Sequence, residues 1–182
     1  MVFLQSDPTP TNNLEKVSLP ELWQKYTMGE RNFEQLNLSD ENFSWLNLKR
    51  INFSQAKLSL AIFEGANLAG ADLSRADLSY TEFTAADLSS ADLREANLTG
   101  ADLRGADLSS ADLRGANLTG ANLTGADLTG TRLNNANLTN TKKPEATINI
   151  SKTHLATVYE KRSLASWLFA PLHEYSSIAY LP

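Results

Sequence analysis

The sequence predicts an all-β solenoid, and three observations support this prediction. A single apolar residue returns at every fifth position without a break from Phe33 to Leu138, which makes 22 units. All of these central residues are Leu or Phe, and the residue two places before the centre is Ala in 15 units. The eight glycines between residues 65 and 130 all lie two places after a centre.

The five-residue period fits neither a regular helix nor a regular strand. On a helix with 3.6 residues per turn, every fifth residue would scatter around the surface, and on a strand an odd spacing would alternate between the two faces. A chain that turns a corner every five residues does fit, because each straight side then presents one centre inward. Glycine suits the corner, since it adopts positive φ without steric cost.

Residues 96–130 read ANLTGADLRGADLSSADLRGANLTGANLTGADLTG, and every unit matches the pattern A-(D/N)-L-X-X. This pattern resembles the pentapeptide-repeat family, and the resemblance extends over residues 31–140. Residues 25–33, KYTMGERNF, look most like the cyanobacterial members. The resemblance implies a right-handed quadrilateral parallel β-helix with four units in each coil. The 22 units then make about 5.5 coils, and the central phenylalanines fall on two opposite sides.

The repeat divides the chain into four segments. We expect a flexible N-terminal arm (1–17), an N-terminal capping helix (18–30), the β-helix (31–140) and a C-terminal cap or tail (141–182).

The capping helix is predicted over residues 18–28. Ser18 and Glu21 have the spacing of a capping box, and Gly29 is a plausible end. The apolar residues Leu19, Leu22, Trp23 and Tyr26 share one helical face. The first coil carries large side chains where Ala is expected, which indicates that this helix packs beneath it. The residues concerned are Arg31, Leu36, Glu41, Leu46 and Ile51.

The five-residue pattern breaks down in the C-terminal segment. Lys143 would be the next centre, so we expect the coil to break there, with Ala146–Ile148 returning to register as a last strand. Family members often associate through the C-terminal end, so the aromatic tail is predicted to be either a cap or a homodimer contact. Its candidate contact residues are Trp167, Leu168, Phe169 and Leu172.

Composition limits the class of protein. The net charge of −5 argues against direct nucleic-acid binding, which needs a basic face. The chain has no cysteine, its first residues do not form a secretion signal, and no apolar run is long enough to span a membrane. We therefore expect a soluble cytoplasmic protein without membrane contact.

No pattern of residues predicts catalysis, a metal site or a cofactor. His154 and His173 are the only histidines, and neither has a metal-ligand partner at suitable spacing. The five-residue period also differs from the nine-residue repeat of calcium-binding β-rolls. We expect no enzyme activity. An enzyme would need a polar constellation within 141–182, where Glu160, His154 and His173 are the candidates.

Two columns of outward residues are acidic. Asp87, Asp107 and Asp127 stack on a side that has no Arg beyond the first coil. The neighbouring column, Asp72, Asp92 and Asp112, has Arg94 and Arg114 two residues further on, and we expect these charges to pair between coils. The acidic side is interpreted either as a solvated face or as a mimic of DNA, as in family members that bind type II topoisomerases.

Charge density argues against the mimic. Residues 31–140 hold 14 acidic and nine basic side chains. At about 4.8 Å per coil the rod is roughly 26 Å long, or one net charge per ~5 Å, against one per ~1.7 Å of duplex DNA.

One part of the surface breaks the polar pattern. Leu60 and Tyr80 share an outward corner, Ile62 replaces the usual Asp or Asn beside them, and Trp45 also points outward nearby. Either a terminal segment of the chain covers this cluster or another protein docks on it. We therefore expect a non-enzymatic scaffold that presents rigid faces to an unidentified protein partner. The alternative is a DNA-mimicking regulator of a type II topoisomerase such as gyrase, of the quinolone-resistance kind.

Overall fold

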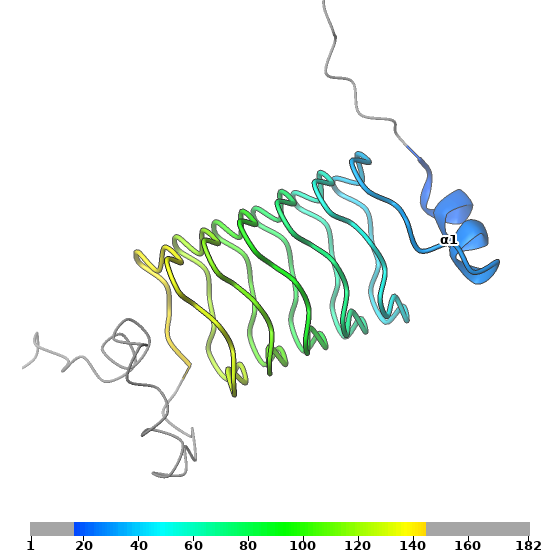
Figure 1. The fold of residues 1–182 in the computed structure, drawn as a ribbon. Helices are drawn as coiled ribbons and strands as arrows, with labels where there is room; N and C mark the ends of the chain where they lie inside the picture. The colour runs from blue at the N-terminus through cyan, green and yellow to red at the C-terminus, as the bar shows by residue number, and fades with distance from the viewer. Residues whose placement is uncertain (1–16, 145–182) are drawn as a thin grey trace, which may run out of the picture.

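The computed structural model describes residues 17–144, which form one helix and a coil of five-residue units (Figure 1). Helix α1 spans Leu19–Thr27 and lies at the N-terminal end of the coil. Along the coil, the residue before each centre forms a parallel β-bridge with the residue 20 positions later, from Asn32–Asn52 to Asn122–Lys142. The predicted right-handed quadrilateral β-helix is confirmed. We name its four sides after their first centres, Phe33, Leu38, Phe43 and Leu48.

The same three backbone hydrogen bonds join successive coils on every side. On the Phe33 side, the Phe33 N–H donates to the Asn52 carbonyl at 2.8 Å, and the Asn52 N–H donates to the Arg31 carbonyl at 2.7 Å. The third bond comes from the corner, where the Gln35 N–H donates to the Ser54 carbonyl at 3.0 Å. Coils are thus joined by a parallel ladder, although each side contributes only one bridging residue.

Every corner has positive φ at its second residue, two places after the centre, as predicted for the glycines. The turn is closed by a hydrogen bond such as that from the Leu46 N–H to the Phe43 carbonyl at 3.2 Å, which is the type II arrangement. Fourteen corners nevertheless carry a residue other than Gly, with φ between 56° and 64°. The turn and ladder bonds therefore hold ordinary residues in a conformation that glycine adopts more readily.

The core is a stack of the central side chains. Phe43, Phe63 and Phe83 form a column in which the Phe43 and Phe63 ring centroids lie 4.7 Å apart and those of Phe63 and Phe83 lie 5.2 Å apart, nearly parallel in both pairs. Phe53 reaches them from the opposite side, with its centroid 5.9 Å from that of Phe43. The prediction of two opposite phenylalanine sides is confirmed, and the N-terminal half of the rod has an aromatic core.

Small residues two places before the centres complete the core. The alanines at these positions from Ala56 to Ala126 are buried. Thr81 and Thr131 replace Ala in two units, and their hydroxyls donate to the Leu58 and Leu108 carbonyls at 3.1 and 2.8 Å. Thr is tolerated there because its buried hydroxyl has a backbone acceptor.

Helix α1 closes the N-terminal end of the core, as expected. Leu22 and Tyr26 are buried, and the Tyr26 hydroxyl donates to the Lys49 carbonyl at 3.1 Å. Arg31 donates to the Tyr26 carbonyl at 2.9 Å, and its guanidinium lies over the Tyr26 ring at 3.9 Å. Of the large first-coil residues, Ile51 is buried, Leu36 and Leu46 are partly buried against the core, and Glu41 is partly exposed.

Two details of this end differ from the predictions. The Ser18 side chain makes no capping hydrogen bond, and Glu21 pairs with Lys25 at 3.6 Å instead of turning back to the helix start. The capping box is therefore not formed, although Gly29 follows the helix with φ of 100° as expected. Val17, assigned to a flexible arm, is buried with the core.

The β-ladder continues past the predicted boundary at residue 140. The Lys142 N–H donates to the Ala121 carbonyl at 2.8 Å, and the Lys142 carbonyl accepts from Leu123 at 2.9 Å. The unit therefore begins in register although a lysine stands at its centre. Lys143 is half-buried there, and Pro144 is buried. The predicted return to register at 146–148 lies outside the described residues.

We predict that Leu108→Ala lowers the free energy of unfolding by about 2–5 kcal/mol, because Leu108 is fully buried in the middle of the rod and its loss leaves a cavity. Urea unfolding followed by circular dichroism measures the change. The exposed Lys57→Ala, which removes no core contact, should change it by less than about 0.5 kcal/mol. A loss below about 1 kcal/mol for Leu108→Ala would contradict the inward column.

Candidate functional site

The Asp and Asn residues before the centres serve the backbone. In most of these units the side-chain Oδ1 accepts a hydrogen bond from the N–H of the residue after the centre. Asn67 accepts from Ala69 at 3.0 Å, and Asp107 accepts from Ser109 at 2.8 Å. These Asx turns satisfy an amide that the ladder does not use. Most outward Asp and Asn residues are therefore explained by local structure before any function is considered.

The predicted acidic face lies on the Leu48 side. Asp87 and Asp127 each accept two bonds, from the amide and the hydroxyl of Ser89 and of Thr129 respectively. Among residues 17–144, no basic side chain forms an ion pair with Asp87, Asp107 or Asp127. The column therefore keeps its negative charge, but its carboxylates are already engaged in turns.

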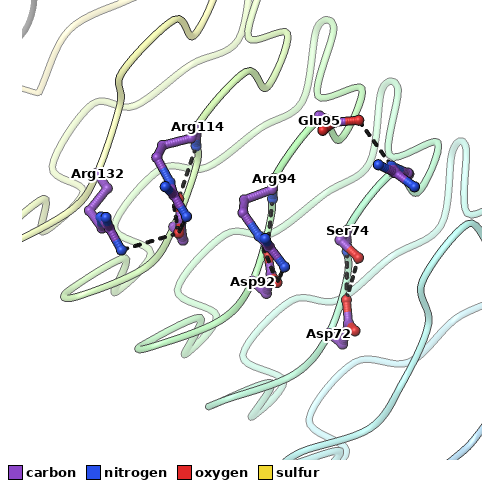
Figure 2. Close-up of polar contacts among 9 residues, drawn as sticks. Asp72, Ser74, Asp92, Arg94, Glu95, Arg114 and Arg132 are labelled. Carbon is purple, nitrogen blue, oxygen red and sulfur yellow. Dashed lines mark hydrogen bonds and ion pairs between the residues drawn. The ribbon is translucent and has the colours of Figure 1, made fainter.

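On the Phe33 side, Asp and Arg pair within a unit (Figure 2). The Arg94 Nε donates to the Asp92 carboxylate at 2.8 Å, and Arg114 does the same to Asp112. The expectation of pairing between coils is wrong for these bonds, because the two side chains flank one centre and both point outward. Two ion pairs on this side and its corner do link successive coils, Arg132 with Asp112 at 3.5 Å and Arg75 with Glu95 at 2.9 Å.

Arginine contacts shift the titration of three carboxyl groups. The hydrogen bond from Arg94 holds the pKa of Asp92 below its usual value, and the bonds from Arg104 and Arg114 do the same for the pKa values of Asp102 and Asp112. Three of the outward carboxylates are thus covered by guanidinium groups. The rod does not present an unbroken negative surface, which weakens its likeness to DNA further.

The predicted apolar cluster spans the Phe43 side and its two corners. Leu60 and Tyr80 lie on the corner before this side and are 55% and 63% exposed. Ile62 lies on the side itself and is partly exposed, and Trp45, 71% exposed, lies on the corner after it. We call these four residues, all in the first three coils, the apolar corner patch.

Glycines of the next coil support both aromatic rings of the patch. A Cβ atom built on Gly65 would lie 2.3 Å from the Trp45 ring, and one built on Gly100 would lie 2.7 Å from the Tyr80 ring. Each ring therefore occupies the space that a side chain on the neighbouring corner would fill. Sequence reasoning missed this role of Gly65 and Gly100, although an aromatic residue followed by Gly 20 positions later could have indicated it.

The patch also interrupts the Asx turns. Ile62 has no acceptor for the amide of Glu64, and Glu82 does not form the short-range bond that Asp or Asn makes in other units. As a consequence, the Thr84 hydroxyl is buried without a hydrogen-bond partner. The Phe43 side thus departs from the structural pattern at adjacent positions of two successive coils.

The described residues hold few other candidates. No group of three or more His, Asp or Glu residues in 17–144 could hold a metal ion, and the helix in this range is too short to span a membrane. The candidate tail contacts Trp167, Leu168, Phe169 and Leu172 lie outside the described residues. His154, His173 and Glu160 also lie outside them.

Comparisons with known proteins place the coil among related folds. A family model described as "Pentapeptide repeats (8 copies)" matches residues 32–65, 66–105 and 106–142. The crystal structure of Rfr23, a pentapeptide repeat protein from the cyanobacterium Cyanothece 51142, is 31% identical with a TM-score of 0.63, and the match covers 66% of this chain and 95% of that one.

Other solved structures match with lower TM-scores. A pentapeptide repeat protein from Nostoc PCC 7120, alr5209, is 36% identical over 71% of this chain and 87% of its own, with a TM-score of 0.34. QnrB1, a plasmid-mediated fluoroquinolone resistance protein, is 20% identical over 71% and 78% of the two chains, with a TM-score of 0.37. No curated protein matches the chain significantly.

We predict that Asp107→Ala lowers the free energy of unfolding by about 0.5–1.5 kcal/mol, because the Ser109 amide loses its acceptor. Asp107→Asn keeps an Oδ1 atom and should be nearly neutral. Thermal and urea unfolding of both variants measure the difference. Glu82→Ala is the matched control, since Glu82 holds the same position without this bond. Equal losses for Asp107→Ala and Asp107→Asn would show that charge, and not the turn bond, is what matters.

Proposed function

This chain belongs to the pentapeptide-repeat family, and on that premise we propose that it is a non-enzymatic binding module whose rod presents the apolar corner patch to a protein partner. Proteins of this family are generally non-enzymatic structural repeat proteins. The proposal places function on the departures from the repeat, because the regular positions are already occupied by the core, the corners and the Asx turns.

The observation that carries the proposal is that two exposed aromatic rings each pack against a glycine of the next coil. Trp45 and Tyr80 are well exposed, yet each lies against a glycine of the following coil. Aromatic side chains contribute a large share of binding energy at protein interfaces. Rings already held on a rigid ladder lose little conformational entropy on binding, which favours affinity.

The charge of the rod does not favour the alternative of topoisomerase regulation. The net charge per unit length of the rod over residues 31–140 is low, and three carboxylates are paired with Arg94, Arg104 and Arg114. A cytoplasmic location and a homodimer contact through the C-terminal end are further proposals, and partner binding at the apolar corner patch depends on neither.

The test is affinity capture from lysate of the source cell with the wild-type chain and with a patch variant. The variant Trp45→Gly, Leu60→Gly, Ile62→Asn and Tyr80→Gly uses residues that occupy the same columns elsewhere in the rod, so it should stay folded. The partner captured by the wild-type chain should be lost. A control with Gln55→Gly, Arg75→Gly and Glu95→Gly, on a different corner, should capture it fully.

Two results would count against the proposal. Capture of the same partner by the patch variant would remove the patch as the binding surface. Inhibition of gyrase supercoiling by the purified chain, unchanged in the patch variant, would favour topoisomerase regulation instead.

A further inference from the structure

The apolar corner patch lies among acidic side chains. Asp40 and Glu41 lie beside it in the first coil, Glu64 in the second and Glu82 in the third. None of the four forms an ion pair within residues 17–144. On the Phe43 side and its two corners, the first three coils contain no Lys or Arg. The surface is therefore complementary to a segment that joins basic residues to apolar ones.

Residues 161–168 of this chain have that composition. Lys161 and Arg162 follow Glu160 directly, which leaves a net charge of +1 over residues 160–168, and Leu164, Trp167 and Leu168 follow within six residues. The N-terminal segment 1–16 is a poor match, because its single Lys16 is outnumbered by Asp7 and Glu15 and its net charge is −1. Charge complementarity thus distinguishes between the two ends of the chain.

The described part of the chain ends on the patch's own side of the rod. Lys143 holds the central position of the Phe43 side, in the column of Phe63 and Phe83, and Pro144 follows it. Three to five coils separate this point from the patch, which is about 14–24 Å at ~4.8 Å per coil. The 16 residues 145–160 can span up to about 50 Å, so residues 161–168 can reach the patch without crossing a corner of the rod.

We propose that residues 161–168 bind the apolar corner patch of the same molecule, with Lys161 and Arg162 against Glu64 and Glu82 and with Trp167 and Leu168 on the apolar side chains. The inference rests on the proposed function, since it concerns the same surface. A protein partner then has to displace the chain's own C-terminal segment, which makes this contact a regulator of binding.

The test is zero-length carbodiimide crosslinking of the full chain at low concentration, with linked peptides identified by mass spectrometry. Links from Lys161 to Glu64 or Glu82 are expected in the monomer. Asp87, Asp107 and Asp127 are the matched control, because they are likewise outward and free of ion pairs with described residues. The patch variant keeps Lys161, Glu64 and Glu82, so loss of the links in that variant would report the apolar half of the contact.

Three outcomes would overturn the proposal. In the first, Lys161 links to the control carboxylates as often as to Glu64 and Glu82. In the second, Glu64 and Glu82 are linked only to Lys16. In the third, the links from Lys161 are found only in a crosslinked dimer. Undiminished links in the patch variant would overturn the apolar half of the contact. Crosslinking needs no partner, so its result is independent of the capture experiment. A variant with Lys161→Glu and Arg162→Glu should capture more partner than the wild type, because its C-terminal segment no longer competes for the patch. If the proposed function is wrong, no partner is captured through the patch, and this variant captures no more than the wild type.

Discussion

The fold depends on one constraint, which is that equivalent backbone atoms of successive coils meet every 20 residues. The central and corner N–H groups donate to the following coil and the bridging N–H donates to the preceding coil, so each unit has a fixed neighbour 20 positions away on either side. Side chains follow the same rule. Phe43 stacks on Phe63, Trp45 lies on Gly65, and Arg75 pairs with Glu95 at 2.9 Å. A departure from the pattern therefore affects the next coil as well.

The five-residue period was enough to predict the inward centres and the positive-φ corners, because it determines which residue of each unit points inward. It could not predict interactions that depend on side-chain reach within one unit. Arg94 binds Asp92 two residues earlier because both side chains leave the same side. Ser18 has the sequence of a cap, but Glu21 pairs with Lys25, and a local pattern cannot decide between these partners. Lys143 shows that backbone pairing of its unit begins even where the central side chain is charged.

The proposed function rests on the positions that depart from the repeat pattern. Ile62 and Glu82 do not form the Asx turn. Trp45 and Tyr80 occupy corners where the residue 20 positions later is glycine. The patch itself was visible in the sequence as a column of unusual residues. The support from Gly65 and Gly100 needed the structure, since it depends on which way the rings turn. Together these features make a surface that is apolar, acidic at its margin and fixed in position.

The constraint of 20 residues can be measured by insertion. Duplicating residues 96–115 directly after Gly115 adds one whole coil and preserves every register. We expect this chain to unfold cooperatively, with a urea m-value that rises with the added buried surface. A single glycine inserted after Asp107 displaces Leu108 from its inward position and should lower the free energy of unfolding sharply. Equal stability of the two insertion variants would show that the register does not hold the rod together.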